Sequence, residues 1–281
     1  MSPTIFLTGA SGYIGGTVLS LITQKHPEWT VSALVRDDTT AAALKKHFPS
    51  VKYVVGDLDS HDVIKDASAS ADVVLSKFTR LSNVDSTLML SSDMASADDI
   101  PAVQSILEGL SQRPAHANRY LIHTSGTGML ADFSTGEGNL APRVWSDIKD
   151  VKEITTLDHT HFHRDVDEAV IDGGIAKNVK TAILSPPTIY GVGLGPLKKR
   201  SIQVPALISG ILSRGKGFTV GKGENMWDAV HVSDVASAYI FLAEEALEGE
   251  KGKAAWGKEG YYFVKDDEFV SRRIPSTSSA C

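Results

Sequence analysis

The most constraining feature of this sequence is a glycine-rich run near its start, Thr-Gly-Ala-Ser-Gly-Tyr-Ile-Gly at positions 8–15. A short apolar run at 4–7 precedes it, and apolar residues at helical spacing follow it at 17–26. In a strand–turn–helix unit of this kind, the turn lets a pyrophosphate approach the backbone, and the free N–H groups of the helix N-terminus attract anions. The pattern therefore predicts a dinucleotide-binding turn made of Thr8, Gly9, Ser11, Gly12, Tyr13, Ile14 and Gly15.

Short apolar runs alternate with amphipathic stretches over the first 190 residues. Alternation of strands and helices implies βαβ units, and right-handed crossovers join such units into a doubly wound parallel sheet. We therefore expect an α/β, Rossmann-type fold. Its predicted strands are 4–7, 31–35, 51–55, 72–75, 119–123 and 181–184, and its predicted helices are 17–26, 41–47, 61–67, 163–171 and one that begins near 99.

The regularity weakens after residue 190. Residues 204–212 and 232–247 have helical patterns, and 218–220 is a short β-branched run. We predict an NAD(P)-binding Rossmann domain at 1–190 and a small C-terminal substrate lobe at 191–264. The polar, serine-rich segment 265–281 has no periodicity, and we predict that it is a disordered tail.

Composition excludes several classes of protein. The 281 residues carry 28 Lys and Arg against 34 Asp and Glu, so no basic surplus indicates a nucleic-acid partner. The longest basic run, Lys198 to Arg200, is typical of a solvated loop. The one cysteine, Cys281, rules out an internal disulfide, and no run approaches the ~20 apolar residues of a membrane helix. We expect a cytoplasmic protein with a small-molecule substrate and neither membrane nor nucleic acid as a partner; the sequence leaves its oligomeric state open.

Charged residues after the second, third and fourth predicted strands concern the choice of cofactor. Arg36 follows the second strand and favours the 2′-phosphate of NADP(H), whereas the neighbouring Asp37 keeps NAD(H) as an alternative. Asp57 and Leu58 follow the third strand, where they would contact the adenine edge or form a plain turn. Lys77 follows the fourth strand and would reach a cofactor phosphate or ribose, unless it is an ordinary loop lysine.

Together these segments resemble the short-chain dehydrogenase/reductase superfamily, in its extended or atypical branch of NAD-dependent epimerase/dehydratase-like and NmrA-like proteins. The resemblance covers roughly residues 4–265 and includes Ile-His-Thr-Ser-Gly at 122–126, which places the catalytic hydroxyl of the family on Ser125. The segment 185–191 resembles the loop beside the nicotinamide. It implies cofactor contacts from Pro186, Pro187 and Thr188. Tyr190 follows this loop and would face the substrate, unless it is a packed loop aromatic. Trp227, in the segment 227–236 that also resembles the family, would line an apolar substrate pocket, unless it belongs to the core.

The sequence departs from the superfamily at its central catalytic device, a Tyr-x-x-x-Lys pair on the helix after the fifth strand. Alignment of that helix puts His159 at the tyrosine position and His163 at the lysine position. The resemblance then implies that Ser125 and His159 carry the proton chemistry and that His163 contacts the ribose. A metal held by His159, His161 and His163 is the less favoured interpretation, because no further ligand motif accompanies them. We therefore predict no metal.

The resemblance implies an NADP(H)-dependent oxidoreductase that acts on a carbonyl or alcohol group of a small organic molecule. Two alternatives stay open at this point. One is a non-catalytic NAD(P)-binding, redox-sensing regulator of the NmrA-like kind. The other is a sugar-nucleotide epimerase or dehydratase.

Overall fold

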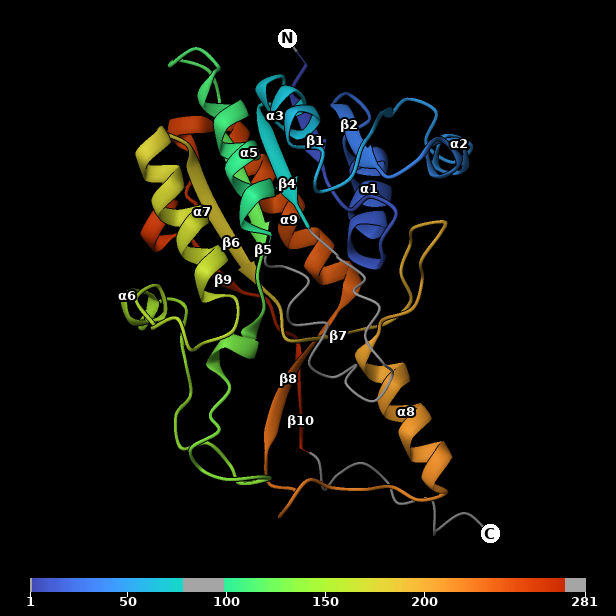
Figure 1. The fold of residues 1–281 in the computed structure, drawn as a ribbon, viewed down its shortest axis with the longest axis vertical. Coiled ribbons are helices and arrows are strands. Elements are labelled where there is room, and N and C mark those ends of the chain that lie inside the picture. Colours follow the sequence, from blue (N-terminus) through green and yellow to red (C-terminus); the bar gives the residue numbers. More distant parts are fainter. Residues whose placement is uncertain (1, 78–98, 271–281) are drawn as a thin grey trace.

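The computed structural model describes residues 2–77 and 99–270, in which seven parallel strands form a central sheet (Figure 1). The spatial order β3-β2-β1-β4-β5-β6-β9 is that of a Rossmann fold, so the predicted α/β class is confirmed. The strand order reverses between β1 and β4, because successive strands are added on one side up to β3 and on the other side from β4 onward, and ligands bind at such a switch point. The strands are β1 (Thr4–Leu7), β2 (Thr30–Val35), β3 (Lys52–Val55), β4 (Val73–Ser76), β5 (Tyr120–Thr124), β6 (Lys180–Ser185) and β9 (Tyr261–Phe263).

Helices cover both faces of this sheet (Figure 1). On one face α1 (Tyr13–Lys25) packs against α9 (Val232–Leu247), and on the other α5 (Ile100–Ser111) lies between α3 (His61–Ala69) and α7 (Arg164–Lys177). Strand β1 shows why both faces are needed. Ile5 and Leu7 join the apolar core beneath α1 and α9, whereas Phe6 joins the core on the α5 side. Successive side chains point to opposite faces, so a strand that is apolar throughout must be covered on both.

A second, three-stranded sheet lies beyond the carboxyl ends of the parallel strands (Figure 1). In it β8 (Met226–His231) pairs parallel with β7 (Thr188–Tyr190) and antiparallel with β10 (Asp267–Val270). The helix α8 (Gln203–Arg214) lies beside this sheet. The remaining elements are α2 (Asp38–Lys45), α6 (Val151–Ile154) and the short 3₁₀ turns Thr127–Leu130, Gly249–Lys251 and Gly257–Glu259.

Three expectations from the sequence need correction. The main sheet does not end at residue 190, because α9 packs on α1 and β9 pairs with β6. The tail predicted to be disordered contains β10; its residues from 271 onward lie outside the described part of the chain. No strand forms at 218–220, where the chain turns and the Gly223 N–H donates to the Val220 carbonyl. A three-residue run with no neighbouring strand has no partner for ladder hydrogen bonds, so its backbone groups form the hydrogen bonds of turns instead.

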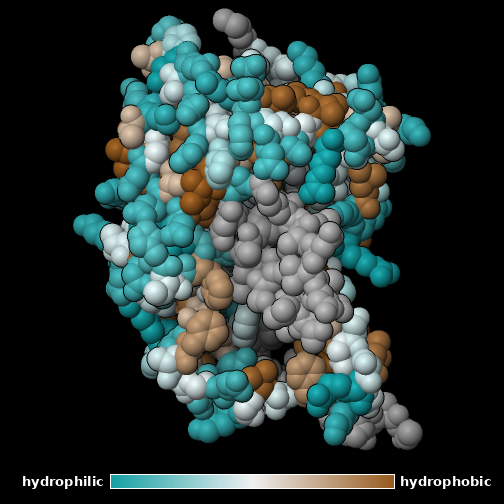
Figure 2. Space-filling model, viewed as in Figure 1, coloured by the Kyte–Doolittle hydropathy of each residue, from teal (hydrophilic) through white to brown (hydrophobic). Residues whose placement is uncertain are grey.

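The surface is largely hydrophilic on the face in Figure 2, with apolar residues in small separate groups. Among the helices of the described residues, none is both long and apolar enough to span a bilayer.

Candidate active site

A cavity of about 710 Å³ lies at the carboxyl ends of the parallel strands. Its walls come from the turn after β1, from the ends of β2, β3, β4 and β5, from the loop between β6 and β7, and from the segment that precedes α8. Every residue predicted to bind the cofactor lines it except Thr8. The predicted residues that do line the cavity are Gly9, Ser11, Gly12, Tyr13, Ile14, Gly15, Arg36, Asp57, Leu58, Lys77, Pro186, Pro187 and Thr188.

The glycine turn forms a cradle that larger side chains would fill. Gly9 has φ +70°, and a Cβ on it would lie 2.4 Å from the carbonyl oxygen of Lys77. A Cβ on Gly15 would lie 2.2 Å from the carbonyl oxygen of Gly9, so the first turn of α1 packs directly on the loop. Gly12 caps α1 without a side-chain hydrogen bond. The first N–H groups of the helix are therefore left for an anion, as a dinucleotide phosphate requires.

Thr8 has a structural role instead of lining the cavity. Its side chain is fully buried, and its Oγ1 accepts a hydrogen bond from the Lys77 N–H at 3.0 Å. The same hydroxyl lies 3.3 Å from the Lys77 carbonyl oxygen, to which it donates. Thr8 thus ties the end of β1 to the end of β4 and holds Lys77 at the cavity wall.

The acidic residues of the cavity lie at the end formed by β2 and β3. Asp37 accepts the Thr40 N–H at 2.7 Å as the N-cap of α2, and this backbone hydrogen bond lowers the pKa of Asp37. Asp57 accepts the Ser60 hydroxyl at 2.8 Å, which is the main cause of its lowered pKa. Both carboxylates are therefore ionised at neutral pH and engaged in their own loops. Arg36 is the cation at this end of the cavity.

At the other end, Ser125 follows β5 and lies above a buried acid. The Ser125 hydroxyl donates to Oδ2 of Asp167 on α7 at 3.0 Å. The Tyr261 hydroxyl, from β9, donates to the same oxygen at 3.0 Å and contacts the sulfur of Met129 at 2.6 Å. Burial, reinforced by the charge of Asp167, raises the pKa of Tyr261 well above its ordinary value, so this phenol stays protonated. Ser125, Asp167 and Tyr261 thus form a buried hydrogen-bonded group beneath the cavity.

His163 lies on the cavity wall next to Ser125. Its side chain is buried, and its backbone has φ +63° immediately before α7, which is rare for a residue other than glycine. Its Nε2 lies 3.2 Å from where a Cβ on Gly126 would be, so the glycine at 126 makes room for the imidazole. The Asp167 N–H donates to the His163 carbonyl at 3.0 Å, and the two residues are one helical turn apart. His163, on the cavity wall, and Asp167, buried beneath it, are therefore the pair with the Tyr-x-x-x-Lys spacing.

This result corrects the alignment that placed His159 at the site. His159 is 67% exposed, its Nδ1 lies 2.5 Å from Oδ1 of Asp165, and it does not line the cavity. His161 points elsewhere again, with its Nδ1 donating to the Met129 carbonyl at 2.6 Å. The three histidines predicted as alternative metal ligands therefore have three different environments. An irregular turn at 158–163 precedes α7, and sequence spacing alone could not place the start of that helix.

The two residues predicted to contact the substrate lie in different environments. Trp227 of β8 lines the cavity and is 44% exposed. Tyr190 does not line it; its hydroxyl donates to Oδ2 of Asp266 at 3.3 Å, and its ring packs edge-on against His231. Tyr190 therefore secures the second sheet to the segment that leads into β10.

Several residues in the cavity wall or beneath it escaped the sequence analysis. Asp167 could have been found, because it stands four residues after His163, but the shifted alignment hid it. No sequence pattern pointed to Tyr261, because it belongs to a strand far along the chain that was not predicted. The segment before α8 and the first residue of that helix contribute six further lining residues, Leu197, Lys198, Arg200, Ser201, Ile202 and Gln203. Lys198 and Arg200 had been interpreted as part of a solvated loop.

Comparison with known proteins agrees with the fold and the glycine turn. A model of the NAD dependent epimerase/dehydratase family matches residues 5–255. The oxidase ucsJ of an Acremonium species is 31% identical over 96% of this chain and 76% of its own length. An uncharacterised Saccharomyces cerevisiae protein, YLL056C, is 28% identical over 88% of this chain and 72% of its own length.

Two solved structures share the fold. Yeast methylglyoxal/isovaleraldehyde reductase Gre2, complexed with NADPH, has a TM-score of 0.64 at 15% identity and covers 95% of this chain and 79% of its own. A double mutant of the Streptomyces venezuelae dTDP-glucose 4,6-dehydratase DesIV, with NAD bound, has a TM-score of 0.64 at 14% identity and covers 96% and 78%. The match of the family model over most of the chain, joined to a Rossmann sheet whose glycine turn opens on a cavity, establishes the relationship. This chain belongs to the NAD-dependent epimerase/dehydratase family, within the extended short-chain dehydrogenase/reductase superfamily.

Proposed function

We propose that this protein is an NADP(H)-dependent oxidoreductase acting on a carbonyl or alcohol group of a small organic molecule. One observation carries the proposal. Ser125 and His163, two side chains that exchange protons, lie on the wall of the same cavity as the glycine turn. The cofactor supplies the hydride chemistry when bound, so the chain must bind, orient and handle one proton.

The environment of Arg36 supports NADP(H) over NAD(H). Arg36 lines the cavity after β2, where a cation favours the 2′-phosphate. The competing acid, Asp37, accepts the Thr40 N–H and so serves as the N-cap of α2. A carboxylate engaged in this way is a poorer acceptor for the two ribose hydroxyls of NAD(H).

The proton is assigned to Ser125 and His163. While Asp167 is ionised, the single hydrogen of the Ser125 hydroxyl is directed at Oδ2, and the oxygen of Ser125 presents its lone pairs to the cavity. It can then accept a hydrogen bond from a substrate alcohol and orient it. Nε2 of His163, at the cavity wall beside Gly126, is the proposed site from which a proton passes to or from the substrate oxygen.

A second candidate function has one observation in its favour. The lysine position of the Tyr-x-x-x-Lys spacing holds Asp167, so the permanent cation of that pair is replaced by a carboxyl group. A protein that binds NADP(H) without turnover, as a redox-sensing regulator, would tolerate this loss.

Calorimetric titration with NADPH, NADP⁺, NADH and NAD⁺ tests the binding part of the proposal. We expect micromolar NADPH binding, and we expect Arg36→Ala to weaken NADPH more than NADH. A screen of aldehydes, ketones and alcohols then tests the chemistry. Tight cofactor binding with no turnover across that screen would favour the redox-sensing regulator. If none of the four cofactors binds, both proposed functions are wrong.

A further inference from the structure

A strap of chain crosses the mouth of the cavity between β7 and α8. It comprises residues 191–202 and contains the basic run that the sequence analysis interpreted as a solvated loop. The structure fastens its first half to α1. The Tyr13 hydroxyl donates to the Gly191 carbonyl at 2.8 Å, and the Leu194 N–H donates to Oγ1 of Thr17 at 3.2 Å. Burial raises the pKa of Tyr13 to about 12, so this phenol remains a donor at neutral pH.

A glycine contact fixes the distance between strap and helix. A Cβ on Gly195 would lie 2.8 Å from Cα of Gly16, and a Cβ on Gly16 would lie 3.2 Å from Cα of Gly195. The two backbones therefore touch, and neither position has room for a side chain. The strap is held against the first two turns of α1, the helix whose N-terminus opens on the cavity.

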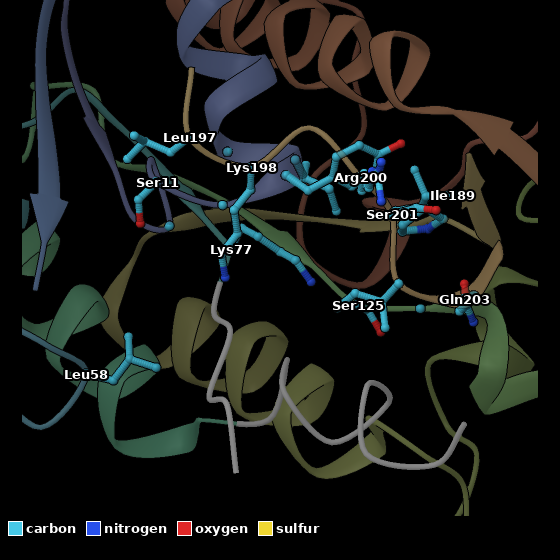
Figure 3. A pocket seen from close by; sticks show the side chains of 18 of the residues that line it. Ser11, Leu58, Lys77, Ser125, Ile189, Leu197, Lys198, Arg200, Ser201 and Gln203 are labelled. Carbon is cyan, nitrogen blue, oxygen red and sulfur yellow. The ribbon is translucent and has the colours of Figure 1, made fainter. Parts of the chain in front are cut away.

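Beyond this contact the strap folds back and delivers Lys198 to the glycine turn. The Gly193 N–H donates to the Lys199 carbonyl at 2.9 Å, which closes the fold. A Cβ on Gly193 would lie 2.9 Å from the Tyr13 ring and 3.2 Å from the Lys198 carbonyl oxygen. The backbone of Lys198 thus lies next to the first residue of α1. In Figure 3 Lys198 lies with Lys77 and Ser11 at one side of the pocket, whereas Arg200 and Gln203 lie toward Ser125.

Lys198 and its neighbour Lys199 carry the same charge but lie in different places. Lys198 lines the cavity, whereas Lys199 does not. Within the described residues Lys198 makes no ion pair or side-chain hydrogen bond. The acids of the cavity, Asp37 and Asp57, lie at the end formed by β2 and β3, where they are engaged in their own loops. Among the described residues the ammonium of Lys198 is therefore a cation without a carboxylate partner, in the same cavity as the helix N-terminus, and an anion is the ligand that both would attract.

We propose that Lys198 binds the diphosphate of the nicotinamide cofactor, as a clamp that the strap holds opposite the glycine turn. The proposal rests on the proposed function, because it needs the dinucleotide in this cavity. A diphosphate accepts charge-assisted hydrogen bonds from an ammonium on one side and from backbone N–H groups on the other. Both NADH and NADPH carry the diphosphate, so Lys198 would bind both. Only NADPH carries the 2′-phosphate, which is assigned to Arg36.

The test compares Lys198→Gln with the matched control Lys199→Gln, which makes the same change in net charge. NADPH and NADH are titrated against each variant by cofactor fluorescence. We expect Lys198→Gln to weaken both cofactors about tenfold, the effect of one charge-assisted hydrogen bond, and Lys199→Gln to change them by less than about twofold. ADP-ribose, which has the diphosphate, should weaken in parallel, and 5′-AMP, which lacks it, should not.

The outcomes separate the clamp from the proposed function. If the wild-type protein binds neither cofactor, the proposed function is wrong and the clamp with it. If it binds them and Lys198→Gln binds equally well, or if both lysine variants lose the same affinity, only the clamp is wrong. A loss confined to NADPH would assign Lys198 to the 2′-phosphate and would also overturn the diphosphate assignment.

A second variant tests the strap itself. Gly195→Ala places a methyl group against the Gly16 backbone and should displace the strap from α1. We expect it to weaken NADPH binding to a similar extent, and we expect the double variant with Lys198→Gln to lose little more than either single variant. Additive losses would show that Lys198 acts independently of the strap. The unfolding temperature of each variant, measured in parallel, shows whether the variant is folded.

Discussion

The Ser125 hydroxyl donates to the buried carboxylate of Asp167 at 3.0 Å, so the side chain at the cavity is oriented by the acid beneath it. A neutral hydroxyl in the cavity is thereby linked to a buried acid. Tyr261 donates to the same carboxylate oxygen and keeps it in place. In this chain the residues around Ser125 therefore differ in charge from the Tyr-x-x-x-Lys pair of the superfamily.

Asp167→Asn tests whether this link matters for turnover. An amide can still accept the two hydrogen bonds, but it has no negative charge to hold the Ser125 hydrogen away from the cavity. For an alcohol substrate found in the screen, we expect kcat to fall about a hundredfold, with KM and the dissociation constant of NADPH little changed. If kcat stays within twofold of wild type, Asp167 is a structural residue only.

His163→Phe and His159→Phe form a matched pair. His163 lines the cavity, whereas His159 is mostly exposed and pairs with Asp165. We expect His163→Phe to lower kcat by at least a hundredfold and His159→Phe to leave it unchanged. Steady-state rates of both variants on one substrate are the measurement. The reverse order would restore the alignment that puts His159 at the tyrosine position.

His123 gives the protein a predictable pH dependence. Burial, with smaller contributions from Lys77 and His163, lowers the pKa of His123 from 6.5 to about 3. Between these two pKa values the unfolded chain therefore binds a proton at His123, whereas the folded chain keeps this side chain neutral. This contribution to stability is complete above pH 6.5 and is lost as the pH falls from there toward 3. Between pH 6 and 5 we expect a loss of about 1 kcal/mol in the free energy of unfolding from this residue.

His123→Gln is the control for this pH dependence. It keeps a polar group near the Ser76 hydroxyl, which lies 3.2 Å from Nδ1 of His123, and it cannot titrate. Urea unfolding of both proteins at several pH values gives the comparison. Parallel stability curves for the two proteins would mean that His123 is not the group responsible.

A partly buried ion pair joins the segment that follows α5 to the residue that precedes β4. Nη2 of Arg113 lies 2.5 Å from Oδ1 of Asp72, and the other oxygen of Asp72 accepts the backbone N–H of Thr4 at 2.8 Å. Arg113→Ala leaves this carboxylate with its Thr4 partner alone. We expect it to lower the free energy of unfolding by about 2–4 kcal/mol. Arg143→Ala removes an exposed pair with Glu153 and should cost less than about 1 kcal/mol.

Sequence patterns predicted those parts of the fold that local chemistry determines. Strand β1, the glycine turn and α1 follow from a short apolar run, close-packed glycines and helical spacing within one continuous segment. Asp167 was missed because His163 starts α7 with a left-handed backbone, and periodicity does not locate such a start. Tertiary packing brings Tyr261 beneath the cavity, by pairing of β9 with β6, and Lys198 to the cavity wall, by the Gly16–Gly195 contact. No local pattern encodes either contact.

The position of Tyr261 in the chain bears on how the protein is made. It follows Ser125 by 136 residues, yet its hydroxyl lies 3.5 Å from that of Ser125. Synthesis runs from the N-terminus, so β1, β2, β3 and their glycine turn leave the ribosome long before β9. The hydrogen-bonded group of Ser125, Asp167 and Tyr261 can therefore be complete only after β9, which pairs with β6, has been translated.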